Sequence, residues 1–361
     1  MPPTLAWLMA ATIVHGPVHA TICPGRATLA AMRIGVLHNR ASGRGKGPAF
    51  VQRLRALAPT RGFDVLDLPL DLASHAGALD DLDAVVLVGG DGTLHHALAF
   101  LTAAHGGRGV PTLIAPLGTE NVVAKELGLR PRVAATLDAL GALRRGAAPV
   151  RSDLGVVHHP DGRPGVPFAL MLTIGPDAAI VHRVARRRTG TGGRLRFVAP
   201  TLARAARPRI GRLSVSVDGQ PLASEQRGCL IVAVGPRYPM RLDLARKATR
   251  TDGLLDALFL PAGTTAELLA WALLARLGLH VGHPRARYAQ GRRVEVTLHE
   301  HRPGAQELED LQIDGEVERV ACDAQGRLVV ESLPAALPLV LPAARQAMPI
   351  QPSPTRAGVS A

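Results

Sequence analysis

The residues best placed for chemistry follow an apolar run, Ala84–Val88, and lie in a turn with three glycines, Gly89, Gly90 and Gly92. The run is typical of a buried parallel strand, and apolar residues recur at helical spacing after Thr93. A strand, a glycine turn and a helix form a phosphate cradle, because backbone N–H groups and the positive helix end face the anion. Asp91 would repel a phosphate unless a cation bridged them, so the turn indicates a nucleotide with Mg²⁺.

The same turn is also compatible with a tight strand-to-helix connection in which Asp91 caps the helix. It is neither a Walker A loop nor a Rossmann fingerprint. Gly-Gly-Asp-Gly-Thr at residues 89–93 resembles the signature of diacylglycerol kinases, sphingosine kinases and related bacterial lipid kinases, which NAD kinases share.

Two further polar turns follow predicted strands. Asn39-Arg40-Ala41-Ser42-Gly43 resembles the Asn-Pro-x-Ser-Gly motif of these kinases, and residues 116–121, Pro-Leu-Gly-Thr-Glu-Asn, resemble their Pro-x-Gly-Thr-x-Asn motif. Ligands of open α/β sheets bind at the carboxyl ends of the strands, where all three turns lie. The resemblance implies that ATP contacts the following residues of the three turns: Asn39, Ser42, Gly43, Gly89, Gly90, Asp91, Gly92, Thr93, Gly118, Thr119 and Asn121.

The second half of the chain carries three further motifs of the family. They are Asp153-Leu154-Gly155, Asp252-Gly253-Leu254-Leu255-Asp256 and Asp314-Gly315-Glu316. The resemblance implies that Asp91 and Asp153 belong to a magnesium network. It also implies that Asp314 is the general base and that Glu316 orients it or assists the metal. Taken alone, Asp314-Gly315 is typical of a β-turn.

The chain departs from the family pattern in three places. Val122 stands where the family has aspartate, His95-His96 replace an Asn-Glu pair, and the stretch before Ala245 lacks a triple glycine. Adjacent helical residues point about 100° apart. We therefore expect His95 and His96 to line the site or lie at the surface, not to share a metal ion.

Alternating strand and helix patterns predict a doubly wound parallel-sheet, nucleotide-binding domain over residues 32–148. Short strand-like runs over 149–333 predict an antiparallel β-sandwich acceptor domain, and in the lipid kinases the active site lies in the cleft between the two domains. The helix predicted over Thr264–Leu279 is expected to pack on the sheet and not to be bound to a membrane. Residues 1–31 are expected to be disordered or a mis-annotated leader, and residues 334–361 a flexible tail.

The 361-residue chain has a formal net charge of +13. The Arg183–Arg212 segment contains no acidic residue, which favours contact with an anionic membrane surface, although a solvated helix face has the same composition. Scarce aromatic residues argue against nucleic-acid binding. Three distant cysteines fit a reducing cytoplasm, and we predict no transmembrane helix. An edge-strand homodimer is compatible with such folds.

Together these features predict a cytoplasmic, peripherally membrane-associated lipid kinase that uses ATP and Mg²⁺. It would transfer the γ-phosphoryl group to a hydroxyl of a diacylglycerol-like or sphingoid lipid. Two alternatives remain open. One is a kinase of another alcohol, such as a soluble polyol or NAD; the other is a catalytically weak, nucleotide-binding lipid sensor.

Overall fold

The structure is a computed structural model that describes residues 31–39, 45–68, 77–175, 210–238, 243–300, 311–316, 318 and 320–342. The leader predicted over residues 1–31 lies outside this range except for its last residue. Nearly all of the Arg183–Arg212 segment is outside it too, as are Ser42 and Gly43. Within the described part of the chain, no helix is long and apolar enough to cross a bilayer.

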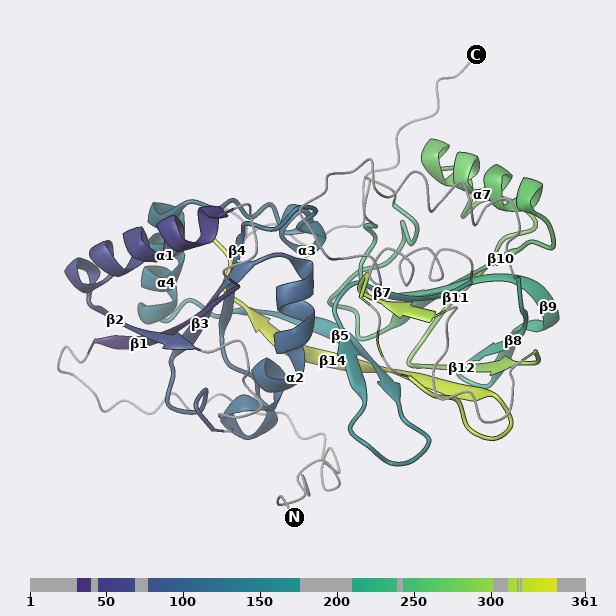
Figure 1. The fold of residues 1–361 in the computed structure, drawn as a ribbon, viewed down its shortest axis with the longest axis horizontal. Helices are drawn as coiled ribbons and strands as arrows, with labels where there is room; N and C mark the ends of the chain where they lie inside the picture. Colours follow the sequence, from purple (N-terminus) through teal and green to yellow (C-terminus); the bar gives the residue numbers. More distant parts are fainter. Residues whose placement is uncertain are drawn as a thin grey trace.

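The first half of the chain alternates strands and helices (Figure 1). Its strands are β1 (Met32–His38), β2 (Phe63–Leu68), β3 (Ala84–Gly89) and β4 (Thr112–Pro116). Its helices are α1 (Lys46–Leu57), the short 3₁₀ helix η2 (Pro59–Arg61), α2 (Asp91–Gly107), α3 (Val122–Glu126) and α4 (Val133–Arg144). The pairs β1–β2, β1–β3 and β3–β4 are all parallel, as the βαβ pattern predicts.

Side chains of alternate residues in β3 enter two different cores, because successive residues of a strand face opposite sides of the sheet. Ala84, Val86 and Val88 pack in the core that includes residues of α1 and α4. Val85 and Leu87 pack in the core that includes the apolar residues of α2. The sheet is therefore covered on both faces, which confirms the doubly wound α/β fold.

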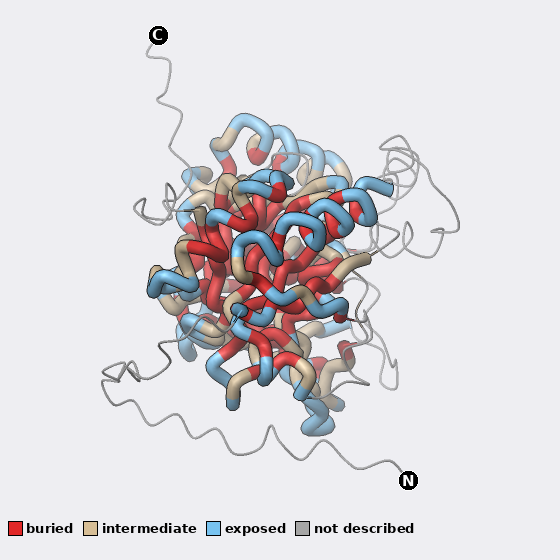
Figure 2. The backbone as a smooth tube through the Cα atoms, turned by 90° about the vertical axis from the view of Figure 1, so that its left-hand side faces the viewer, coloured by how far each residue is buried: buried red, intermediate tan, exposed pale blue. Residues whose placement is uncertain are grey.

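The second half is mostly antiparallel. Its described strands are β5 (Val150–His158), β6 (Val166–Phe168), β7 (Met171–Ile174), β8 (Arg212–Val217), β9 (Gln220–Ala233), β10 (Leu255–Pro261), β11 (Arg287–Gly291), β12 (Arg293–Leu298), β13 (Leu311–Ile313) and β14 (Arg327–Leu339). The helix described in this half is α7 (Thr265–Leu277). A core of residues from β7, β9, β10, β12 and β14 fills the interior of this β-sandwich. Figure 2 shows the buried chain at the centre and exposed helical turns outside.

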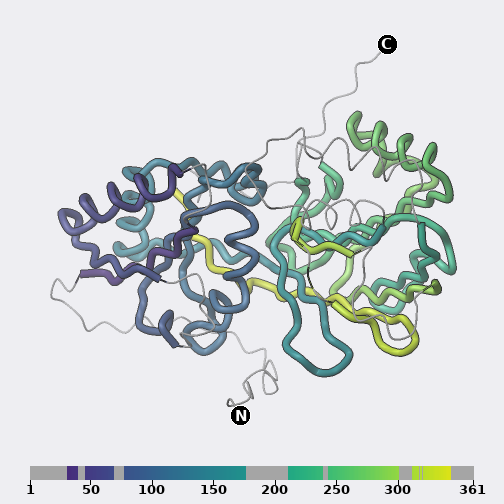
Figure 3. The backbone as a smooth tube through the Cα atoms, in the orientation of Figure 1, coloured from purple at the N-terminus to yellow at the C-terminus, as the bar shows by residue number. Residues whose placement is uncertain are grey.

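The strand β14 joins the two halves, and this corrects the prediction of a flexible tail from residue 334. The strand continues to Leu339, which pairs with Thr112 of β4, while β5 pairs along most of its length. Leu337, Leu339, Val340 and Leu341 are buried because the apolar residues of this segment extend the core of the first domain. Figure 3 shows this yellow segment entering the purple and blue lobe.

A buried ion pair also links the two halves. Arg250, which precedes β10, donates from Nε and Nη2 to the two carboxylate oxygens of Glu126 in α3, at 2.6 and 2.9 Å. The side chains are 1% and 5% exposed. The Nη1 group of Arg250 donates to Ser152 Oγ and to the carbonyl oxygen of Ala169, at 3.3 and 3.2 Å. The guanidinium therefore contacts β5, the segment before β7 and the first domain.

We expect Glu126→Gln to lower the free energy of unfolding by about 3 kcal/mol, because it leaves a buried guanidinium without its carboxylate partner. Urea unfolding followed by circular dichroism measures this change. Asp138→Asn is the matched control, because Asp138 pairs with Arg61 on the exposed surface, where an ion pair contributes at most about 1 kcal/mol. Equal losses for the two variants would contradict the structural role given to Arg250.

Candidate functional site

Three turns meet at one edge of the parallel sheet. In the register of the sheet, His38 of β1 lies beside Val88 of β3, and Gly89 lies beside Pro116 of β4. Asn39 donates its N–H to the carbonyl oxygen of Val88 at 3.4 Å. The predicted binding residues after β1, β3 and β4 that the structure describes therefore come together. Ser42 and Gly43, predicted in the first turn, lie outside the described residues.

The turns after β3 and β4 contact each other through their backbones. A Cβ atom added to Gly118 would lie 2.4 Å from the Cα atom of Gly90, and the N–H groups of Leu117 and Gly118 donate to the carbonyl oxygen of Gly89. A Cβ added to Gly89 would lie 2.4 Å from Thr93 Oγ1. Glycine is required at position 118 because no side chain fits between the two backbones.

Asp91 reaches from one turn to the other. Its carboxylate accepts hydrogen bonds from the N–H groups of Val122 and Val123, the first residues of α3, at 2.9 and 3.2 Å. Burial raises the pKa of Asp91, and these two N–H groups oppose that rise. Asp91 therefore caps α3. The alternative that the sequence left open, in which Asp91 caps the helix that it begins, α2, is not what the structure has. The N-cap residue of α2, Gly90, has no side chain to cap the helix, so N–H groups at the N-terminus of α2 are oriented toward the turn.

Asn121 shapes the turn after β4. Its backbone is left-handed, with φ of 48°, and its Nδ2 donates to the carbonyl oxygens of Gly118 and Pro116. The Oδ1 atom is buried and has no hydrogen-bond partner in the described structure. Thr119, by contrast, is exposed. Asn121 therefore holds the turn through its amide nitrogen and presents an unsatisfied oxygen beside Gly90 and Gly118.

Asp314 and Gly315 form a tight turn after β13. The backbone of Ile313 exchanges two hydrogen bonds with that of Glu316, and φ is 52° at Asp314 and 82° at Gly315. Positive φ at both central residues is the hairpin geometry that an Asp-Gly pair favours. This turn brings Glu316 against the first domain, where its Oε1 lies 2.5 Å from the position of a Cβ added to Gly92.

The Asp314 carboxylate, whose side chain is 2% exposed, is surrounded by donors. Oδ1 accepts from the N–H groups of Leu170 and Met171 at 2.8 and 3.1 Å, and Oδ2 accepts from Ala169 at 2.9 Å. His95 Nδ1 lies 3.4 Å from Oδ2 and completes four contacts. A carboxylate has about four lone-pair positions, so in this structure all of them face donors.

His95 bridges two carboxylates. Its side chain is 3% exposed, and its second ring nitrogen, Nε2, lies 2.8 Å from Glu318 Oε1. Burial alone would lower the pKa of His95, but the hydrogen bonds to Asp314 and Glu318 raise it to about 10. The hydrogen bond to His95 lowers the pKa of Glu318. The ring is therefore an imidazolium that donates one hydrogen bond to each carboxylate.

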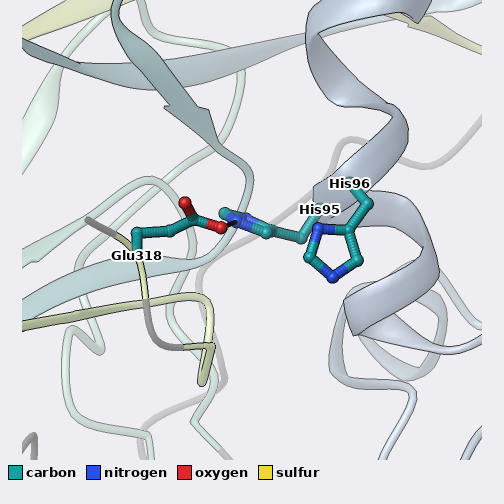
Figure 4. A group of neighbouring side chains, drawn as sticks. All are labelled: His95, His96 and Glu318. Carbon is teal, nitrogen blue, oxygen red and sulfur yellow. Dashed lines mark hydrogen bonds and ion pairs between the residues drawn. The ribbon is translucent and has the colours of Figure 1, made fainter. Parts of the chain in front are cut away.

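His96 is exposed, and its ring lies beside that of His95. Figure 4 shows the His95 ring edge-on, between Glu318 and His96. One potential ligand atom from each of His95, His96 and Glu318 falls within 4.8 Å of the others. The distance between these atoms would thus allow His95 and His96 to share a metal ion, contrary to the reason given for expecting that they do not. Both nitrogens of His95 are already hydrogen-bonded, however, so a metal ion bound by His95 and Glu318 would have to replace the proton shared between them. We assign His95 to the carboxylates.

Asp153, predicted with Asp91 as a metal ligand, has different surroundings. Its carboxylate accepts from the N–H groups of Gly253 and Ala335, both at 2.7 Å. Burial raises its pKa, and the charged groups that face it are Asp252 and Arg250. Asp153 fixes the turn before β10 and the irregular part of β14. Its role in metal binding stays a prediction.

Sequence reasoning missed Arg250 and Glu318. Arg250 directly precedes the Thr251-Asp252-Gly253 stretch, and this position was the one available signal. Glu318 lies two residues beyond the Asp-Gly-Glu motif, where nothing in the sequence separates it from a surface acid. Its significance follows only from the pairing with His95.

We expect Gly118→Ala to destabilise the protein by more than Gly282→Ala, since the added Cβ would meet the backbone of Gly90. Gly282 has open space around its position and is the matched control. Thermal unfolding of the two variants measures the difference. A Gly118→Ala variant as stable as Gly282→Ala would show that the two turns are not in rigid contact.

We also expect the stability of the wild-type protein to depend on pH through His95. Its pKa is about 10 in the folded state and 6.5 in the reference state, so its contribution is complete below pH 6.5 and is lost as the pH rises toward 10. The slope is at most about 1.4 kcal/mol per pH unit. Urea unfolding across this window should give a flatter profile for His95→Gln, while His96→Gln keeps the wild-type slope.

Comparison with known proteins agrees with this architecture. Residues 33–151 match the diacylglycerol kinase catalytic domain, and residues 171–341 match the YegS C-terminal NAD kinase beta sandwich-like domain. A diacylglycerol kinase of Bacillus subtilis (strain 168) is 25% identical over 248 residues, which cover 68% of this chain and 75% of that protein. A crystal structure of a diacylglycerol kinase from Bacillus anthracis str. Sterne has a TM-score of 0.60 at 15% identity, covering 87% and 98% of the two chains. The chain belongs to the family of diacylglycerol kinase and YegS-like lipid kinases.

Proposed function

We propose that this protein uses ATP and Mg²⁺ to phosphorylate a hydroxyl group of a diacylglycerol-like or sphingoid lipid. One observation carries the proposal: the Asp314–Glu316 turn of the second domain lies against the glycine turn of the first. Oδ2 of Asp314 is 3.4 Å from His95 of α2, and Glu316 lies against Gly92. Groups suited to a phosphate chain and groups suited to an acceptor hydroxyl are therefore adjacent.

The site suits a nucleotide with a divalent cation. The uncapped N-terminus of α2 favours phosphate oxygens. Four carboxylates, those of Asp91, Asp314, Glu316 and Glu318, stand around this turn, and carboxylate oxygens are the ligands that Mg²⁺ prefers. Asp91 and Glu316 would hold the ion, which when bound supplies charge neutralisation for the phosphates. Asn121 Oδ1 is a further oxygen without a partner at the same turns.

The acceptor hydroxyl would lose its proton to Oδ2 of Asp314. Among the four contacts of that carboxylate, the one with His95 Nδ1 is the longest and the easiest for a hydroxyl to displace. The acceptor oxygen then forms its bond to the γ-phosphorus as the bond to the β-phosphate oxygen breaks, giving ADP. Asp314 keeps the proton until the products leave and the carboxylate is again open to solvent.

The choice of a lipid acceptor is supported by the family and by its named relative. The Bacillus subtilis protein is a diacylglycerol kinase and aligns with 68% of this chain. The second domain matches the YegS-type sandwich, whose position beside the glycine turn makes it the natural acceptor domain. We therefore place the reaction at a membrane surface.

The direct test is incubation of the purified protein with Mg²⁺, radiolabelled ATP and mixed micelles containing one lipid at a time. We expect label in a diacylglycerol-like or sphingoid lipid, and a loss of 10²- to 10⁴-fold in kcat for Asp314→Asn, the usual effect of removing a general base. Asp161→Asn is the control, because Asp161 is an exposed carboxylate that pairs with Arg163. Label in a soluble polyol or NAD without lipid would instead support the kinase of another alcohol.

One observation favours the alternative of a weak, nucleotide-binding lipid sensor. All four acceptor positions of Asp314 face donors, and Val122, which stands where the family has aspartate, is buried at 4% exposure. Retained ATP binding by calorimetry with no labelled lipid in any micelle would support the sensor. Turnover that depends on Asp314 would exclude it.

A further inference from the structure

The helix α7 presents an unusual outer surface. Among the described residues, six large apolar side chains are exposed, and four of them belong to α7 or the turn that follows it. These four, Leu269, Leu273, Leu277 and Leu279, are 58–61% exposed. We call them the α7 leucine face. Soluble monomers rarely gather exposed large apolar residues on one element without a partner for them.

The spacing places the leucines of the helix on one side. Leu269, Leu273 and Leu277 are four residues apart, so they follow one another along a single helix face. The opposite side is already used: Trp271 and Ala275 are buried in the core, and Trp271 Nε1 donates to the carbonyl oxygen of Pro261 at 2.7 Å. The helix is therefore apolar on both sides, although among the described residues only one side has a protein partner.

The outer side carries little charge. Its exposed residues are Ala266, Leu269, Ala270, Ala272, Leu273, Arg276 and Leu277, of which only Arg276 is charged. A helix face exposed only to water usually carries several charged residues. The leucine face is thus built to be covered by apolar material.

The helix is also held rigidly. Thr264 caps its N-terminus by accepting from Glu267 N, and the Glu267 carboxylate accepts in return from Gly263 N at 2.8 Å. Gly278 ends the helix with φ of 73°, and Arg246 donates to its carbonyl oxygen at 2.6 Å. A capped helix of 13 residues is too short to span a bilayer but long enough to lie in its interface.

The charges around α7 favour an anionic surface. Arg246 contacts the end of the helix, Arg276 lies on its outer side, and Arg285 pairs with Glu267 near its start. Lys247, next to Arg246, is exposed and lies 4.9 Å from the ring centre of Tyr288. Three acidic residues are described near these cations. Glu267 is paired with Arg285, Asp256 near Lys247 is fully buried, and Asp243 lies near His280 and Arg246. Leucines rimmed by cations match anionic headgroups above acyl chains.

We propose that the α7 leucine face docks on an anionic lipid bilayer and so holds the kinase at the surface that contains its substrate. Figure 1 shows α7 on the outside of the second domain, away from the parallel sheet. The biological purpose of this docking, bringing the site to a lipid substrate, rests on the proposed lipid kinase function. The contact is carried by α7 and the cations around it, independently of the Arg183–Arg212 segment that the sequence suggested for this contact.

The test is co-sedimentation of the full-length protein with vesicles of phosphatidylcholine alone or mixed with phosphatidylglycerol, without ATP. We expect binding to the mixed vesicles, and at least a tenfold lower partition for the triple variant Leu269→Gln, Leu273→Gln, Leu277→Gln. Glutamine keeps the helix, which circular dichroism verifies. The matched control, Leu57→Gln with Leu66→Gln, changes the two exposed leucines of the first domain and should bind as the wild type does. Arg276→Glu should weaken binding to the anionic vesicles alone.

Unchanged vesicle binding by the triple variant would overturn the proposal, as would a wild-type protein that binds neither vesicle. A wild-type dimer in sedimentation velocity that the triple variant abolishes would also overturn it, because the face would then join two copies. A second assay, phosphorylation of a short-chain, water-soluble diacylglycerol, tests the kinase activity separately from membrane docking. The triple variant should retain this activity, because the substrate needs no membrane. If the wild-type protein lacks the activity, the proposed kinase function is contradicted and the vesicle result is unaffected.

Discussion

A buried guanidinium holds the two halves of the candidate site at a fixed separation. Arg250 forms a two-pronged pair with Glu126 of α3 and also donates to the carbonyl oxygen of Ala169, whose own N–H donates to Asp314. Burial alone would lower the pKa of Arg250, but Glu126 raises it, so the charge is retained in the interior. Because a buried charge is tolerated only with its partners in place, the position of the second domain follows from this contact. The turn at Asp314 is positioned by the same contact, because Ala169 is hydrogen-bonded to both Arg250 and Asp314.

The glycine turn has a second use that its motif does not reveal. Its glycines were interpreted as space for phosphate oxygens, yet Gly90 is also needed so that the turn after β4 can approach. Asp91 then ties the two turns by capping α3. The helix α3 carries Glu126 at its other end, so one short helix connects the proposed phosphate side of the site to the buried ion pair. Rigidity in these turns is what a preorganised phosphate site requires.

Sequence patterns predicted most strands within a few residues, because β-branched runs and glycine turns act locally. Three features depended on contacts between distant segments. Pro334 and Pro338 made the end of β14 look like a frayed tail, whereas Leu337 and Leu339 bury themselves against the first domain. The strand β11, with Arg287 and Gln290, has no apolar alternation and forms because β10 offers an edge to pair with. The predicted site residues around the turns converge, but Asp153 is held by Gly253 and Ala335, a pairing that no spacing in the sequence encodes.

The replacement of asparagine by histidine at position 95 changes the charge of the site, and the structure shows what compensates for it. An imidazolium buried in α2 would be unfavourable alone, so it lies between Asp314 and Glu318. The same arrangement neutralises one of the carboxylates that crowd the glycine turn, and less cationic charge is then needed from a bound ion. A cation held in this way gives the proposed base, Asp314, a defined position, and His95 is the residue that fixes it through its contacts with Asp314 and Glu318.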